Sequence, residues 1–332
     1  TAKLSAGGMG GLVLTTSSIE RGHTSIAAPL ATAVTATADT FPKLLLEQAR
    51  IRGTHPAIRE KDFGIWQSWS WAEVLQNVRL LAGGFAALGM RRGDRVAIIG
   101  DNRPQLYWSI VASQCLGAVP VPVYQDAGAE EMQFVLEHAE TRFAVVEDQE
   151  QVDKLLTIMD RLPALERVIY KDGRGMRHYR QALLTSLAEV MEQGRALDRE
   201  RPDFFPAELA KGEGSDVSVI AYTSGTTGRP KGVMLSYDNL IKSAELSTRF
   251  DHLTASEEVM AYLPMAWVGD HFLSYAQAYV AGFTVNCPES GDTVMQDLRE
   301  IGPTYFFAPP RIFETILTRV MIRMEDAGWI NR

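Results

Sequence analysis

Apolar and polar residues alternate along this chain with two different periods, and the changes of period predict its elements. Phe41 to Arg52 has its apolar residues at helical spacing. Trp71 to Leu88 does the same and ends at Gly89, a residue typical of helix C-caps. Between these two helices, the alternating tryptophans of residues 56–71 predict a short hairpin, whose rings we expect to pack in the core.

From residue 95 onward, short apolar runs alternate with helical patterns of about ten to fifteen residues, which predicts right-handed crossovers and a mainly parallel sheet. The expected strands are 96–99, 118–124, 143–147 and 168–170, and the expected helices are 104–116, 129–139 and 151–162. Because Pro120 and Pro122 have no backbone N–H, we expect strand 118–124 to be irregular or to lie at an edge.

A second alternating series follows residues 171–215, which are polar and contain one expected helix, near 180–192. The later expected elements are helices 238–249, 272–281, 294–301 and 311–326, and strands 259–263, 283–286 and 305–308. The sequence therefore predicts an α/β fold with two doubly wound, mainly parallel sheets flanked by helices.

The two series flank a segment rich in glycine and hydroxyl side chains, Tyr222-Thr-Ser-Gly-Thr-Thr-Gly-Arg-Pro-Lys-Gly232. Glycines let backbone N–H groups approach a phosphate, hydroxyls donate to phosphate oxygens or ligate a cation, and a lysine adds a mobile charge. The candidate phosphate-binding residues are Thr223, Ser224, Gly225, Thr226, Thr227, Gly228, Lys231 and Gly232. A simple surface turn would explain the glycines but not the lysine and proline.

This segment differs from the Walker A loop, in which the lysine directly follows a glycine and precedes serine or threonine. Lys231 instead lies three positions after Gly228 and is followed by Gly232. No kinase signature is present either, so a kinase or a P-loop NTPase is disfavoured.

The composition is that of an ordinary globular protein, with 46% apolar and 22% charged residues. A net charge of −8 argues against a general affinity for nucleic acid. Cys115 and Cys287 lie far apart without paired spacing, so a disulfide framework or a zinc site is not expected, and a reducing cytoplasm is the simplest location. No apolar run approaches the roughly 18 residues of a membrane span.

Residues 1–40 lack a starting methionine and are rich in alanine, threonine, serine and glycine, so we expect a flexible leader there. The chain ends six residues after the expected helix 311–326. We therefore expect it to be a fragment of a longer protein.

The glycine- and hydroxyl-rich segment resembles, over eleven consecutive positions, the signature loop of the adenylate-forming (acyl-activating) enzymes. Other segments resemble the N-terminal half of bacterial long-chain acyl-CoA synthetases: Glu60-Lys-Asp-Phe-Gly-Ile-Trp66, Gly93-Asp-Arg-Val-Ala-Ile-Ile99, Asp101-Asn-Arg-Pro104, Gly117-Ala-Val-Pro120, Tyr262-Leu-Pro-Met-Ala266 and Pro303-Thr-Tyr-Phe-Phe-Ala-Pro-Pro-Arg-Ile-Phe-Glu314. The last of them favours the fatty-acyl branch.

The resemblance implies an N-terminal domain of two doubly wound subdomains plus a small barrel, followed by a small mobile C-terminal domain. By this analogy residues 93–250 form the first subdomain, which contains the loop. Residues 41–92 then pack with 257–332 in the second, incomplete one, and the C-terminal domain is absent.

The activity implied by the resemblance is adenylation of a long-chain fatty acid by ATP with Mg²⁺, followed by transfer of the acyl group to coenzyme A. Lys231 and Thr226 would be catalytic residues at the phosphates, and Thr223 matches the loop position associated with Mg²⁺. The partners would be these small molecules, and peripheral membrane contact stays open for a lipid substrate.

Two departures from the family pattern bear on the site. After Leu263-Pro264 the family often has a histidine near the acyl carboxylate, and Trp267 occupies that position here, with His271 four residues on. Trp267 and His271 are therefore candidate substrate-binding residues. The later adenine- and ribose-binding motifs and the C-terminal catalytic lysine have no counterpart, so we expect this chain alone to bind nucleotide weakly and not to turn over.

Two alternatives remain open from the sequence. One is a ligase of the same superfamily that activates an aryl acid or an amino acid. The other is a non-catalytic fragment that binds a nucleotide or an acyl group. The sequence does not determine the acyl chain length or the oligomeric state.

Overall fold

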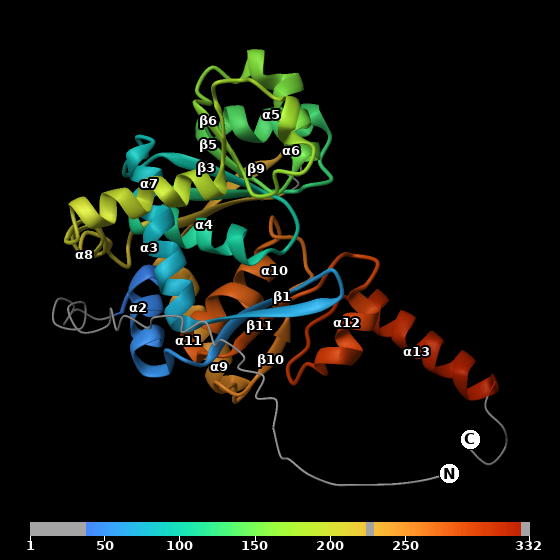
Figure 1. Cartoon of the computed structure of the whole chain (residues 1–332). Helices are drawn as coiled ribbons and strands as arrows, with labels where there is room; N and C mark the ends of the chain where they lie inside the picture. Colours follow the sequence, from blue (N-terminus) through green and yellow to red (C-terminus); the bar gives the residue numbers. More distant parts are fainter. Residues whose placement is uncertain (1–37, 224–228, 327–332) are drawn as a thin grey trace, which may run out of the picture. The chain divides into compact units, whose positions relative to one another are not determined.

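A computed structural model describes residues 38–223 and 229–326, in which strands form three sheets (Figure 1). Of the expected leader 1–40, residues 1–37 lie outside the described part. Thr40 belongs to the folded structure, since its side chain caps the helix α2 (Phe41–Arg52).

The first sheet has five parallel strands in the order β4-β3-β5-β6-β7, which confirms the predicted parallel α/β architecture. Its strands are β3 (Arg95–Ile99), β4 (Val119–Val123), β5 (Thr141–Val146), β6 (Arg167–Tyr170) and β7 (Leu184–Ser186). β4 contains Pro120 and Pro122 and lies at the edge of this sheet. An edge strand pairs with a neighbour on one side only, so the absence of the proline N–H groups is tolerated there.

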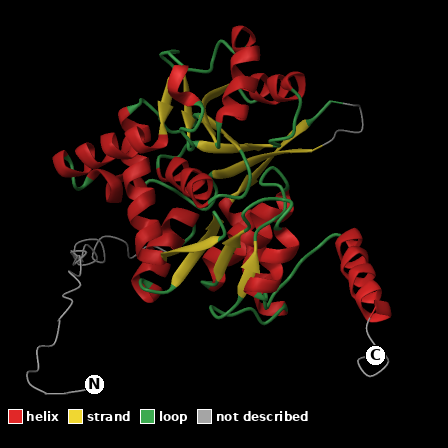
Figure 2. Cartoon of the chain, turned by 45° about the vertical axis from the view of Figure 1, so that its right-hand side comes forward, coloured by secondary structure: helices red, strands yellow, loops and turns green. Residues whose placement is uncertain are grey.

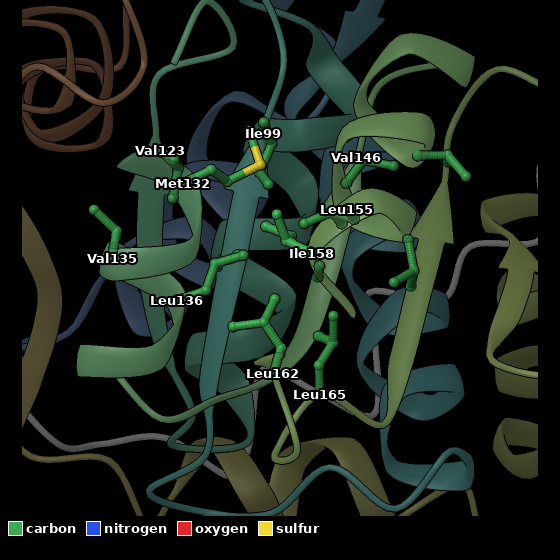
Figure 3. Close-up of a cluster of buried hydrophobic side chains, with 14 of the residues drawn as sticks. Ile99, Val123, Met132, Val135, Leu136, Val146, Leu155, Ile158, Leu162 and Leu165 are labelled. Atoms are coloured by element: carbon green, nitrogen blue, oxygen red, sulfur yellow. The ribbon is translucent and has the colours of Figure 1, made fainter. Parts of the chain in front are cut away.

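Helices cover this sheet and bury its apolar strands. They include α4 (Pro104–Cys115), α5 (Ala129–His138), α6 (Gln149–Ile158) and α7 (Leu187–Glu200). Helices α3 (Trp71–Ala87) and α8 (Phe204–Leu209) pack against α4, and short 3₁₀ turns lie at Met159–Arg161 and Met176–His178. Figure 3 shows the core in which Met132 and Leu136 of α5 and Leu155 of α6 meet Ile99 and Val146 of the strands. The mainly apolar strands follow from burial on both faces.

The second sheet has four strands in the order β10-β11-β1-β2. β1 (Pro56–Asp62) and β2 (Ile65–Ser70) form the predicted antiparallel hairpin, while β1, β11 (Thr284–Cys287) and β10 (Glu258–Met260) are parallel. Ile58 pairs with Val285, so segments far apart in sequence lie side by side (Figure 1). The predicted domain boundaries stay a prediction.

The later helices are α9 (Tyr237–Phe250), α10 (Val268–Asp270), α11 (Gln277–Ala281), α12 (Val294–Ile301) and α13 (Pro310–Asp326). The expected helix 272–281 is not regular, because His271–Ala276 forms a π-helical turn before α11. The expected strand 305–308 is reduced to a single bridge between Tyr305 and Val259.

The helix expected near 180–192 was misplaced. α7 begins at Leu187, because the Ser186 hydroxyl accepts the N–H of Glu189 and the Glu189 carboxylate accepts the N–H of Ser186. This capping box fixes the start of the helix. The preceding residues Leu184–Ser186 form strand β7 instead.

Arg103 links the two main sheets. Its Nε lies 2.6 Å from Oε1 of Glu147, which follows β5, and its Nη1 and Nη2 donate to the carbonyls of Pro288 and Glu289, which follow β11. Glu60 on β1 adds a second carboxylate 3.8 Å from the same Nε. The planar guanidinium suits this role because its donors point in fixed, different directions.

Helices α3 and α7 approach each other closely through glycines. A Cβ placed at Gly194 would lie 1.7 Å from the carbonyl oxygen of Leu80, and one at Gly84 would lie 2.0 Å from that of Val190. Neither contact can be relieved by rotating a side chain, since both involve backbone atoms.

We expect Gly194→Ala to lower the free energy of unfolding by about 1–3 kcal/mol, because the added methyl group forces the two helices apart. Urea denaturation followed by circular dichroism measures this. Gly291→Ala is the matched control, since a Cβ there meets no atom within 4 Å. Equal unfolding midpoints for the two variants would contradict the close approach.

Candidate active site

The glycine- and hydroxyl-rich segment connects the two strands of an antiparallel hairpin, β8 (Val217–Thr223) and β9 (Lys231–Ser236), which forms the third sheet (Figure 2). Thr223 pairs with Lys231, and Tyr222 pairs with Gly232. Thr223 and Lys231 are both exposed, at the end of the hairpin where the loop joins the two strands. The fold therefore brings a hydroxyl and a cationic side chain from the predicted site to neighbouring positions.

Five of the predicted phosphate-binding residues lie outside the described part of the chain: Ser224, Gly225, Thr226, Thr227 and Gly228. Their roles stay predictions, including the catalytic role of Thr226. The roles of Thr223, Lys231 and Gly232 also stay predictions, although the hairpin places these three residues together.

Gly232 leaves room for the aromatic ring of Tyr222 beside it. A Cβ at this position would lie 3.2 Å from Cζ of Tyr222 and 3.0 Å from Cγ2 of Ile220. Any larger residue would have to push one of these side chains aside. The glycine thus has a packing reason at this position in addition to its predicted phosphate role.

Helix α5 contacts the hairpin just before and after the loop. The Tyr222 hydroxyl lies 2.7 Å from Nδ1 of His138, and the guanidinium of Arg229 lies 6.0 Å from the centre of the Phe134 ring. Phe134 and His138 are one helical turn apart and stack on each other. These contacts fix both ends of the loop against one helix.

A cleft of about 1130 Å³ lies between α5, the end of β4 and the hairpin. The described residues of its lining include Tyr124, Glu130, Phe134, Thr223, Arg229 and Trp267. Thr223 and Trp267, both predicted from the sequence, therefore face the same cleft. Its lining combines aromatic rings with the carboxylates of α5.

His271, the other predicted substrate-binding residue, is not brought to this cleft. Its ring is buried, stacks on Tyr275 at 4.7 Å and meets Phe41 edge-on. Burial lowers the pKa of His271 to about 4, so the imidazole is neutral at pH 7. Its Nε2 has no hydrogen-bond partner among the described residues. This environment is that of a core residue.

The described residues contain no group of three or more histidine, cysteine, aspartate or glutamate side chains arranged to hold a metal ion. The predicted metal contact, the Thr223 hydroxyl, belongs to a described residue, and its role stays a prediction. A Mg²⁺ ion beside it would take phosphate oxygens and water molecules among its ligands, as this ion usually does. None of the described helices has the length and apolar character of a membrane span.

Sequence reasoning does not find two polar residues that shape the site, His138 and Asn102. Their partners lie far away in the chain: Tyr222 is 84 residues after His138, and Leu263 is 161 residues after Asn102. No local pattern signals such pairs. The resemblance of Asp101-Asn-Arg-Pro104 to the family was the only sign that Asn102 could matter.

Comparison with known proteins places this geometry in a family. The model of the family described as "AMP-binding enzyme" matches residues 45–327. The rat long-chain-fatty-acid–CoA ligase ACSBG1 is 30% identical over 276 residues, which cover 80% of this chain and 37% of that protein. The ligase FadD15 of Mycobacterium bovis is 29% identical over 269 residues, covering 80% and 42%. The chain thus spans about two fifths of these relatives.

Solved structures share the fold at lower identity. A long-chain-fatty-acid-CoA ligase (FadD1) from Archaeoglobus fulgidus has a TM-score of 0.72 at 22% identity, covering 86% of this chain and 55% of the other. The anthranilate CoA ligase AuaEII, solved with anthranoyl-AMP, has a TM-score of 0.70 at 19% identity, covering 81% and 49%. With a family match over most of its length, this chain belongs to the AMP-binding enzymes.

Proposed function

We propose that this chain contains the phosphate-binding part of an ATP-dependent, AMP-forming acyl-CoA ligase that acts on long-chain fatty acids. The observation that supports this most directly is the arrangement at the hairpin. Thr223 and Trp267 line one cleft, and Lys231 is the cross-strand neighbour of Thr223. The names of relatives about 30% identical support the substrate class.

The proposed chemistry needs charge neutralisation more than proton transfer. A fatty carboxylate is ionised at neutral pH, so its attack on the α-phosphorus of ATP requires no general base. The obstacle is the approach of two anions and the departure of pyrophosphate. The exposed ammonium of Lys231 would bind the phosphates and stabilise the charge that develops on them.

The Thr223 hydroxyl would bind the phosphates or the magnesium ion that accompanies ATP, whose charge offsets that of the phosphate oxygens. Tyr222 and Arg229, through their contacts with α5, would keep the two ends of the loop in place beside the cleft. The thiol of coenzyme A would then accept the acyl group from the acyl-adenylate and release AMP.

An aryl-acid ligase is the second candidate. The fold is equally similar to that of the anthranilate CoA ligase, at a TM-score of 0.70. The aromatic part of the cleft, with Tyr124, Phe134 and Trp267, would accept an aryl ring as well as an alkyl chain. A panel of palmitate, decanoate and anthranilate, tested by pyrophosphate release with a full-length protein that contains this chain, separates the two candidates.

Binding of Mg·ATP to this chain should be weak but should depend on Lys231. We expect Lys231→Ala to lower the affinity at least about tenfold, since a hydrogen bond between charged groups contributes roughly 1.5–3 kcal/mol. Titration followed by saturation-transfer NMR at millimolar ATP measures it. Lys242→Ala is the control, because Lys242 is an exposed lysine on α9. If both variants bind like the unmodified chain, Lys231 does not contact the phosphates.

Turnover by residues 1–332 alone should be absent, because the later nucleotide-binding motifs of the family have no counterpart in this sequence. With ATP, Mg²⁺, coenzyme A and each acid of the panel, we expect pyrophosphate release no faster than without acid. A coupled pyrophosphate assay provides the rate. Robust, acid-dependent release would refute the expected inactivity and would identify the preferred acid at once.

A further inference from the structure

The segment Leu263 to Asp270, called the turn below, includes α10 (Val268–Asp270), and its residues Ala266 and Trp267 line the cleft. Backbone bonds in this turn meet at Trp267: its N–H donates to the carbonyl of Pro264 at 2.8 Å, and its carbonyl accepts the N–H groups of Asp270 at 3.0 Å and His271 at 3.4 Å. A side chain from outside the turn adds bonds at its two ends.

One side chain reaches both ends of this turn. Nδ2 of Asn102 lies 3.0 Å from the carbonyl oxygen of Leu263 and 3.0 Å from Oδ1 of Asp270. Tyr107 completes the cluster, since its hydroxyl lies 2.8 Å from Oδ2 of Asp270 and 2.8 Å from Nδ2 of Asn102. The primary amide has two N–H groups, so it can donate to the start and the end of the turn at once.

The cluster is buried, so a hydrogen bond lost from it is poorly replaced by water. Asn102 is 7% exposed, Tyr107 5% and Asp270 1%. Burial raises the pKa of Asp270 to about 7, against the hydrogen bonds from Tyr107, Ser274 and Asn102, which favour the ionised carboxylate. A buried polar group without a partner costs about 1–3 kcal/mol, so loss of the amide would leave the Leu263 carbonyl and Asp270 undersatisfied.

Asn102 is itself held in place by its neighbours in the chain. It follows β3 of the parallel sheet and precedes Arg103, whose guanidinium binds Glu147 and the carbonyls after β11. Pro104 then begins α4, the helix on which Tyr107 lies. The amide is thus attached to a loop that is itself bonded to both main sheets.

We propose that Asn102 is a positioning residue for the acyl-binding wall: its amide bridges Leu263 and Asp270 and thereby holds Trp267 against the cleft. The assignment of an acyl substrate to this wall rests on the proposed function. The bridge itself does not, because it is a property of the described structure. Asn102 touches neither the cleft nor the hairpin and acts only through the turn.

Amide hydrogen exchange, read by NMR or by mass spectrometry of peptides spanning 261–271, tests the bridge in this chain. We expect Asn102→Leu to speed exchange at Trp267 and Asp270 by about tenfold or more relative to the amides of β3 and β5. The fluorescence assigned to Trp267, obtained by difference from Trp267→Phe, should shift toward that of a solvated indole.

Gln114→Leu is the matched control. Like Asn102, Gln114 has a buried side-chain amide. It lies on α4 and forms hydrogen bonds with Ser218 and Tyr275, not with the turn. Its loss should lower overall stability while leaving exchange in the turn unchanged relative to the sheet. Equal exchange in the turn for Asn102→Leu and Gln114→Leu, or no increase for Asn102→Leu, overturns the proposal.

Asn102→Ser keeps the inference testable if Asn102→Leu does not fold. A serine hydroxyl has a single donor, so it cannot donate to both Leu263 and Asp270, and it adds no bulk to the buried cluster. Faster exchange at Trp267 and Asp270 than at the sheet amides supports the bridge, and unchanged exchange overturns it. The Mg·ATP titration tests the proposed function separately: a bridge without Lys231-dependent binding would retain the positioning role of Asn102 and remove the proposed phosphate role of Lys231.

Discussion

The loop between β3 and α4 is the constraint on which the rest of the described structure depends. Within it, Arg103 donates to a carboxylate at the end of β5 and to two carbonyls after β11, and Asn102 donates to the turn that lines the cleft. Gly100 makes the arrangement possible, because a Cβ there would lie 2.6 Å from Cβ of Glu147. Two adjacent side chains therefore connect the parallel sheet, the mixed sheet and the cleft wall.

This loop also lies where doubly wound proteins commonly bind ligands. The strand order β4-β3-β5 reverses direction at β3, and the crevice at the carboxyl ends of these strands is the usual site. Here Arg103, Glu147 and Glu60 occupy that position with an ionic cluster whose arginine is 11% exposed. Because its charges are paired with one another and with carbonyls, this cluster connects the two main sheets. The candidate site lies instead at the β8–β9 hairpin.

Two parts of the candidate site are held by contacts with other parts of the chain: the hairpin on either side of the loop by α5, and the turn that contains Trp267 by Asn102. His138 and Phe134 of α5 contact Tyr222 and Arg229 on either side of the loop. The bridge from Asn102 acts on the turn that contains Trp267. This division suits an enzyme that must bring a polyphosphate and a carboxylate together, since their approach depends on the two sides keeping a fixed separation.

The sequence by itself determined the parallel sheet, its proline-containing edge strand and the loop that carries the resemblance. Each of these features depends on residues that are close together in the sequence: apolar runs, helical spacing, or consecutive glycines, hydroxyls and a lysine. The predicted start of α7 was wrong although Ser186 and Glu189 form a local capping signal. Residues 305–308 have the pattern of a strand but contribute a single bridge, because their pairing depends on β10.

Only the tertiary structure decided which of the candidate residues meet. Trp267 faces the cleft with Thr223, while His271, four residues later, is buried against Tyr275. The bridge by Asn102 and the contact of His138 with Tyr222 join residues 161 and 84 positions apart. The chemistry of a side chain indicates which interactions a residue can make. Contacts between distant segments arise from packing in three dimensions, which no local pattern in the chain encodes.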